Sequence, residues 1–193
     1  MPESVSQPEE SEKSELQWLA GTLPMAKYQK LEDLLKAKHW QDADQETYRL
    51  MITTVDKDEE QSLNHEDLQN FPCEDLLILD ELWVKYSEGK WGFSVQERMW
   101  EECLGDELYP YNDKTEAQLD QFGDRVGWRK EGEWLSYESL ALISSGELPH
   151  VNVLFGEHSS WGLYAFYRRF FQCDFVERYR KSIENEAPYS DLR

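Results

Sequence analysis

Apolar residues recur every three or four positions in the first part of the chain after residue 25. This spacing places them on one face of an α-helix. A break at residues 39–41 divides the pattern, so we expect a helical hairpin whose second arm starts around Asp42. The first arm carries Leu31, Leu34 and Leu35, and the second carries Ala43, Thr47, Leu50 and Met51.

Two further helices are predicted between residues 64 and 89. Asn64, followed three residues later by Asp67, resembles a capping box, which starts a helix. Pro72 ends that helix or begins the next, because proline has no N–H to donate inside a helix. The second helix is strongly amphipathic, and Gly89 is its natural end. Its apolar residues are Leu76, Leu79, Leu82, Trp83 and Tyr86.

The pattern stays helical but becomes less regular towards the C-terminus. A helix is predicted over 93–105 with Ser94 as its cap, and short helices with glycine turns follow. Residues 147–160 are predicted to be extended or irregular, and an apolar segment begins at Trp161. Strand-like alternation is not sustained over several segments. The pattern therefore predicts an all-α, single compact domain with long loops.

Charge and composition exclude one class of partner and indicate where the folded domain begins and ends. The 193 residues include 40 acidic and 20 Lys or Arg side chains, which gives a net charge of −20. Such a surface repels phosphate backbones, so nucleic acid is excluded as a partner. Residues 1–24 are rich in Pro, Ser and Glu and are expected to form a disordered acidic tail. We expect the folded domain over 25–176 and a C-terminal extension over 177–193.

The three cysteines, Cys73, Cys103 and Cys173, include no CxxC pair. Their odd number and wide spacing favour reduced, mostly buried thiols in a reducing compartment. The chain has no apolar run long enough to cross a bilayer, and its first residues lack the pattern of a secretory signal. We therefore expect the protein to be made in the compartment where it works.

Motifs for common catalytic chemistry are missing from the sequence. It contains no glycine-rich phosphate loop, no HExxH and no GxSxG. The run His65-Glu66-Asp67 could suggest a metal site, but acidic residues are also favoured in the first turn of a helix. These observations predict a non-enzymatic binding module without a metal site.

Five stretches occur in an order that is characteristic of one family. They are "ADQETYRLM", "FPCEDL", "LDELWVKYSEGKWGFSVQ", "FGDRVGWRKEGEWLSY" and "GELP". Over about residues 28–174 the chain resembles the GUN-four ("genomes uncoupled four") domain of oxygenic phototrophs. The resemblance implies an all-helical domain shaped like a cupped hand. It also implies binding of protoporphyrin IX and its magnesium complex, with no cofactor held permanently.

The resemblance further implies a role and a location. Members of this family stimulate magnesium chelatase in chlorophyll biosynthesis, acting through its large porphyrin-binding subunit. We therefore expect a monomer in a cyanobacterial cytoplasm or an algal plastid stroma, with a peripheral contact to the thylakoid membrane. A divergent paralogue that binds a linear bilin, or a pigment-free protein-interaction module, is the alternative.

The implied ligand surface has an apolar palm and a cationic rim. Val55, Tyr137 and Leu140 are candidates for the palm, and Arg49, Arg129 and His150 for the rim. Three positions depart from the family pattern, because Tyr48 and Phe155 stand near expected arginines and His65 stands near an expected aromatic residue. Arg168 and Arg169 are further candidates for the missing cations.

Two aromatic segments have both a structural and a functional interpretation. Trp83, Trp91 and Phe93 identify the family, and we expect them to pack in the core. The segment from His158 to Lys181 carries an apolar stripe flanked by arginines. It either closes the core as a last helix or lies on a membrane or partner surface, and we favour the first. The stripe comprises Leu163, Phe166, Tyr167, Phe170 and Phe171.

Overall fold

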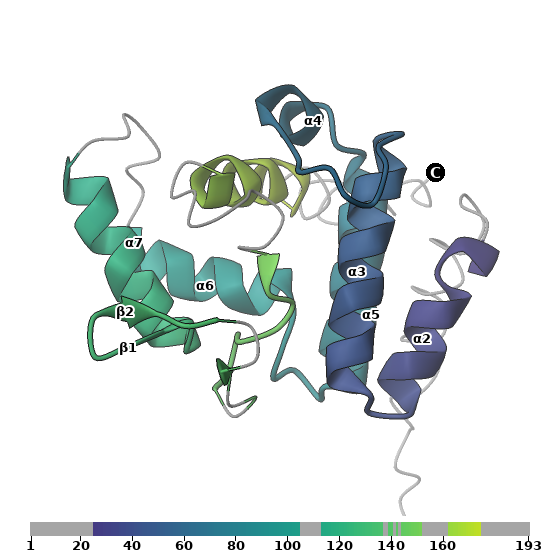
Figure 1. Ribbon diagram of the computed structural model, residues 1–193, viewed down its shortest axis with the longest axis horizontal. Helices are drawn as coiled ribbons and strands as arrows, with labels where there is room; N and C mark the ends of the chain where they lie inside the picture. The colour runs from purple at the N-terminus through teal and green to yellow at the C-terminus, as the bar shows by residue number, and fades with distance from the viewer. Residues whose placement is uncertain are drawn as a thin grey trace, which may run out of the picture.

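The computed structural model is built almost entirely of helices (Figure 1). It describes residues 25–104, 113–136, 139, 140, 142, 144–151 and 162–174. The predicted tail (1–24) and extension (177–193) lie outside these ranges. The helices are η1 (Met25–Lys27), α2 (Gln29–Lys36), α3 (Trp40–Thr54), α4 (His65–Gln69), α5 (Cys73–Tyr86), α6 (Phe93–Leu104), α7 (Asp113–Val126) and a last helix over 162–174.

The predicted hairpin is formed by α2 and α3, which pack together with α5 at one end of the molecule (Figure 1). Leu31 and Leu35 of α2 are fully buried, as are Ala43 and Met51 of α3. The chain turns at Lys38, whose φ is 58°, and α3 begins at Trp40. The second arm thus starts two residues earlier than Asp42, where we expected it.

Local signals set the starts of α4 and α5 as predicted, whereas α5 ends at Tyr86, three residues before Gly89. The Asn64 side chain accepts a hydrogen bond from the Asp67 N–H, and the Asp67 carboxylate accepts one from the Asn64 N–H. Pro72 precedes the first residue of α5 in an extended conformation. Within the core, the indole N–H of Trp83 donates to the Thr47 hydroxyl over 2.9 Å and ties α5 to α3.

The start of α6 differs from the prediction. We expected Ser94 to cap this helix, but Ser94 lies in its first turn and donates its backbone N–H to Asp80 of α5 over 2.8 Å. A residue in the preceding helix therefore satisfies the free N–H at the start of α6. The connecting turn contains Gly89, with φ 78°, and Gly92, with φ 141°.

The other end of the molecule contains α6, α7 and a short hairpin (Figure 1). Its strands, β1 (Arg129–Lys130) and β2 (Glu133–Trp134), are antiparallel, with Arg129 opposite Trp134. Each strand has two residues, so the all-α prediction is confirmed in its main point. None of the described helices is both long and apolar enough to span a bilayer.

The 162–174 helix closes the aromatic core, as we expected for the last apolar segment. Leu163, Phe166, Tyr167 and Phe170 of this helix are all at most 1% exposed. Phe93 contacts the rings of Phe166 and Phe170 edge-on. Trp83 and Trp91 are also buried, so the core interpretation of the family-specific aromatics is confirmed. They are 0% and 3% exposed.

The prediction of reduced thiols is wrong for two of the three cysteines. Cys73 and Cys173 form a disulfide, with Cα atoms 5.1 Å apart and 100 residues of separation. Packing of the 162–174 helix beside the start of α5 brings them together, and sequence spacing alone carried no sign of it. Cys103 is a free, half-buried cysteine.

Candidate functional site

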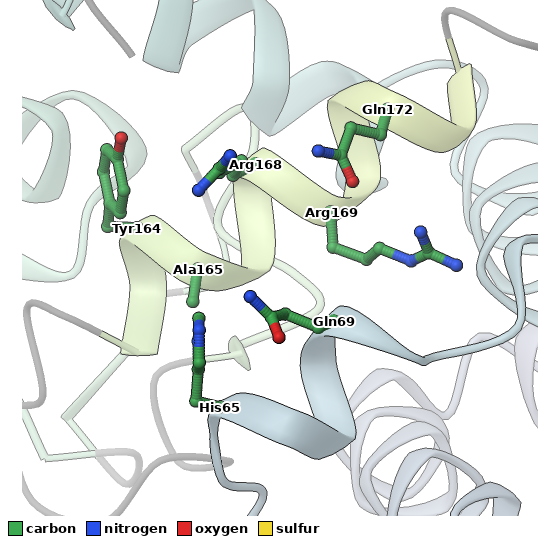
Figure 2. Close-up of a pocket in the computed structure, with 7 residues that line it drawn as sticks. All are labelled: His65, Gln69, Tyr164, Ala165, Arg168, Arg169 and Gln172. Atoms are coloured by element: carbon green, nitrogen blue, oxygen red, sulfur yellow. The ribbon is translucent and has the colours of Figure 1, made fainter. Parts of the chain in front are cut away.

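A cleft of about 240 Å³ lies between α4 and the 162–174 helix (Figure 2). His65 and Gln69 line it from α4 and point towards the other helix (Figure 2). On the 162–174 helix, its lining residues follow the three- and four-residue steps of one helical face. They are Tyr164, Ala165, Arg168, Arg169 and Gln172.

The capping box positions the α4 wall. Because Asn64 and Asp67 bond each other's backbone, α4 begins at His65, and this exposed residue is placed at the cleft. The opposite wall is held by the buried stripe on the far side of the 162–174 helix. The cleft is thus formed by a short capped helix and by the polar face of a helix anchored in the core.

Arg169 connects the two walls at the base of α4. Its Nε and Nη2 both donate to the carbonyl oxygen of Phe71, over 3.0 and 2.7 Å. Burial lowers the pKa of the Arg169 guanidinium, but arginine remains protonated at neutral pH. Arg168 and Arg169 leave the helix in different directions (Figure 2). Arg169 therefore fastens the turn after α4, while Arg168 is the half-buried second cation of the cleft.

The charge of this cleft is opposite to that of the chain as a whole. Its seven lining residues include two arginines and no acid, whereas the protein carries a net charge of −20. Guanidinium groups pair well with carboxylates because their planar N–H donors match two oxygens. The cleft is therefore suited to an anionic group carried by a ligand.

A second, much smaller cavity brings together Tyr48 and His150, two of the predicted site residues. Its volume is about 10 Å³, near the lower limit for one water molecule. The backbone N–H of His150 donates to Asp44 over 2.8 Å, and its ring meets Trp128 edge-on at 4.9 Å. The Tyr48 hydroxyl lies 3.3 Å from the Gln61 carbonyl. This cavity is too small for a tetrapyrrole.

Arg49 and Arg129, two of the predicted rim residues, pair with acids of the chain itself. Arg49 forms an ion pair with the buried Glu46, whose other partner is Lys30. Burial alone would raise the pKa of Glu46, but hydrogen bonds from Arg49 and Lys30 outweigh it and lower that pKa. Arg129 bridges Asp120 and Asp124 of α7 and lies over the Trp134 ring.

The remaining predicted residues are distributed over the fold. Val55 follows α3 and is half-buried against the core. Leu140 is 8% exposed and belongs to the core cluster. Tyr137 and Phe155 lie outside the described residues. Of the predicted set, His65 lines the larger cleft, and Tyr48 and His150 line the smaller cavity. Within the described part of the chain, His, Cys, Asp and Glu side chains form no group of three that could hold a metal.

Comparison with known proteins places this architecture in a family. The family model described as GUN4-like matches residues 23–165. The chain belongs to the GUN4-like family. The ligand-free structure of Arabidopsis thaliana GUN4 matches with a TM-score of 0.55 and 26% identity, covering 72% of this chain and 94% of that one. The fold class predicted from the resemblance is thereby confirmed.

Curated relatives of this GUN4-like chain come from a plant and an alga. The chloroplastic tetrapyrrole-binding protein of Arabidopsis thaliana is 32% identical over 141 residues, which cover 65% of this chain and 49% of that protein. The uncharacterised ycf53 protein of Porphyra purpurea is 29% identical over 151 residues, covering 71% and 58%. The chain therefore spans about half the length of these relatives.

Sequence reasoning found the cations of the GUN4-like cleft but missed most of its other lining residues. Arg168 and Arg169 were candidates as replacements for the rim cations that the family pattern leads one to expect. Tyr164 and Gln172 lie four residues on either side of Arg168, so helical spacing could have predicted that they share its face. No pattern in the sequence predicts Gln69, because its approach to the 162–174 helix is set by tertiary packing.

Proposed function

We propose that this GUN4-like protein binds a tetrapyrrole without acting as an enzyme, and that the cleft between α4 and the 162–174 helix receives the ligand's anionic edge. The observation that carries the proposal is the cationic lining of this cleft in a strongly acidic chain. Family membership and the name of the Arabidopsis relative support the same ligand class. We propose residues 25–176 as the binding domain.

The size of the cleft limits how much of the ligand it encloses. Sites that bury a drug-sized ligand usually measure about 300–1,000 Å³. At about 240 Å³, this cleft is below that range. It can hold the propionate edge of a porphyrin while one face of the ring lies against neighbouring surface. Arg168 is the proposed partner of a propionate.

The ligand we propose is protoporphyrin IX or its magnesium complex, bound reversibly. As the family resemblance implies, the bound pigment would serve to regulate magnesium chelatase through the large porphyrin-binding subunit of that enzyme. The cytoplasm of a cyanobacterium or the stroma of a plastid is the matching location. Four residues of the apolar stripe, Leu163, Phe166, Tyr167 and Phe170, are buried, so a peripheral contact with the thylakoid membrane would have to use other residues.

Replacing Arg168 with alanine tests the proposed propionate contact. Deuteroporphyrin IX, a soluble dicarboxylate porphyrin, can be titrated while tryptophan fluorescence is followed. A hydrogen bond to a charged group contributes about 1.5–3 kcal/mol, so we expect the Kd of Arg168→Ala to rise roughly ten- to a hundredfold. The dimethyl ester of the same porphyrin should lose much less affinity, because it carries no charge to pair.

Arg125→Ala is the matched control for this experiment. Arg125 is more than half exposed and pairs with Glu102 between α7 and α6. Its loss removes the same charge from the protein without touching the cleft, so the Kd should stay within about twofold of the wild-type value. Equal losses for the acid and the ester in Arg168→Ala would show that Arg168 does not pair with a propionate.

A second candidate function is a pigment-free protein-interaction module, or one that binds a bilin. It is favoured by the ion pairs of two predicted rim residues, Arg49 with Glu46 and Arg129 with Asp120 and Asp124. A folded, helical protein that leaves tryptophan fluorescence unchanged with deuteroporphyrin IX, with or without Mg²⁺ in the ring, would support this candidate. A titration with biliverdin would then separate its two forms.

A further inference from the structure

The disulfide lies at one end of the cleft and links its two walls. Cys73 is the first residue of α5 and follows the turn at Phe71 that ends the α4 wall. Cys173 follows Gln172, a lining residue of the opposite wall. A covalent bond between them limits how far α4 and the end of the 162–174 helix can separate.

The 162–174 helix does not depend on this bond alone for its position. Phe166 and Phe170 are fully buried, and the Tyr167 hydroxyl donates to Gln96 of α6 over 2.9 Å. Arg169 holds the Phe71 carbonyl through two hydrogen bonds. Opening the disulfide should therefore loosen the last turn of the helix and the α4 wall while the rest of the helix stays docked.

The two cysteines differ in exposure. Cys73 is half-buried, whereas Cys173 is 1% exposed, so we expect an incoming thiolate to attack the sulfur of Cys73. The attack forms a mixed disulfide with Cys73 and releases the Cys173 thiolate, which takes up a proton. A second thiol of the attacking protein then displaces Cys73. The chain gains two electrons and two protons, and the attacking dithiol becomes a disulfide.

The position of Cys73 favours the second step. As the first residue of a 14-residue helix, it lies at the positive end of the helix dipole, which stabilises a thiolate and makes it a better leaving group. Disulfides inside cells are usually transient and redox-sensing, since thiol reductants are present there. One of the relatives described above is a chloroplastic protein, which matches such a setting.

We propose that Cys73–Cys173 is a reversible redox latch on the cleft, opened by a protein dithiol of the C-x-x-C type. The oxidised form holds the cleft walls in place and binds an anionic ligand more tightly, because less ordering is needed on binding. The reduced form has looser walls and binds it more weakly. The effect on tetrapyrrole affinity rests on the proposed function, whereas the latch itself does not.

The test uses the full chain carrying Cys103→Ser, so that only the two latch cysteines can react. Maleimide labelling counts thiols before and after dithiothreitol, and hydrogen exchange follows the amides of residues 65–71 and 168–174. Upon reduction we expect two new thiols, unchanged helical circular dichroism and faster exchange confined to these segments. The Kd for deuteroporphyrin IX should rise fivefold or more. A thioredoxin-type protein dithiol should produce the same changes.

The variant Cys73→Ser/Cys173→Ser should match the reduced form in oxidising and reducing buffer alike. The latch is overturned if both thiols label before reduction, if helicity is lost on reduction, or if neither exchange nor affinity responds. Failure of the protein dithiol where dithiothreitol succeeds would overturn the proposed partner. If deuteroporphyrin IX binds neither form, the proposed function fails. The latch is then tested by hydrogen exchange alone, and it stands only if reduction speeds exchange in the two segments.

Discussion

Two buried acids in this chain have pKa values shifted in opposite directions. Burial raises the pKa of Asp80 to about 6, although the N–H of Ser94 donates to it, and the nearby Asp174 adds to the rise. The pKa of Glu46 is lowered, since hydrogen bonds from Arg49 and Lys30 outweigh its burial. Asp80 is the more deeply enclosed of the two and accepts from the Ser94 N–H, whereas two cations donate to Glu46. The difference in pKa therefore comes from both desolvation and partners.

Asp80→Asn should change how stability depends on pH. The folded pKa of Asp80 lies above its unfolded value, so its contribution is complete below about pH 4 and is lost as pH rises through 6. The loss corresponds to about 3 kcal/mol. Asparagine can still accept from Ser94 but does not ionise. We therefore expect the variant to gain stability relative to wild type between pH 4 and 7, as measured by urea unfolding.

Glu46→Gln is the control with the opposite sign. The lowered pKa of Glu46 gives a contribution that is present above its unfolded pKa and is lost as pH falls. Its removal should therefore cost stability near neutral pH and little in acid. Parallel stability curves for wild type and Asp80→Asn across this range would contradict an elevated pKa at Asp80.

At the scale of elements, the junction between α5 and α6 depends on a close backbone approach. A Cβ at Gly92 would lie 2.6 Å from Val84 and 2.8 Å from the Asp80 carboxylate oxygen, the atom that receives the Ser94 N–H. The absence of a side chain at this position therefore allows α5 to supply the cap of α6.

Gly92→Ala should destabilise the protein more than Gly89→Ala. Both glycines have positive φ, but a Cβ at Gly89 meets no atom within 4 Å. Backbone strain of roughly 1–2 kcal/mol is expected at such positions. The contact at Gly92 should add about 1–3 kcal/mol through overpacking. Thermal and urea unfolding of the two variants measure the difference. Equal losses of stability would show that the α5–α6 junction accommodates a Cβ at residue 92 without overpacking.

At the scale of the whole molecule, the disulfide joins two parts of the chain that lie far apart in sequence. It closes a loop between Cys73 and Cys173, with 100 residues of separation, and such a crosslink restricts the unfolded chain. Cys73→Ser should therefore lower the free energy of unfolding by about 2–4 kcal/mol in oxidising buffer. Cys103→Ser is the matched control, because Cys103 is not crosslinked.

Adding dithiothreitol should remove most of the difference between Cys73→Ser and the parent chain, because both then lack the crosslink. Urea unfolding with and without the reductant gives this comparison directly. If Cys73→Ser were as stable as the parent chain under oxidising conditions, the disulfide would make no contribution to global stability. Its role would then be confined to the local positions of the cleft walls.

The helices before residue 105 and the family could be read from the sequence. Helical spacing of Leu31 and Leu35, the capping box at Asn64 and the proline before α5 act within a few residues along the chain. After residue 105 we expected short helices with glycine turns, but α7 is a single helix of 14 residues that runs through Gly123. The ordered aromatic motifs identified the family, and the prediction that the last apolar segment closes the core followed from its stripe.

Contacts between distant parts of the chain follow from tertiary packing. This packing joined Lys30 of α2 to Glu46 of α3, and it brought Cys73 to Cys173. Arg49 and Glu46, by contrast, already stand three residues apart on α3. Tertiary packing also placed Arg168 opposite α4, which made a cleft from two helices far apart in sequence. Forty acids and twenty Lys or Arg side chains allow many pairings, and burial of the aromatic core selects among them. Local spacing carries no information about that choice.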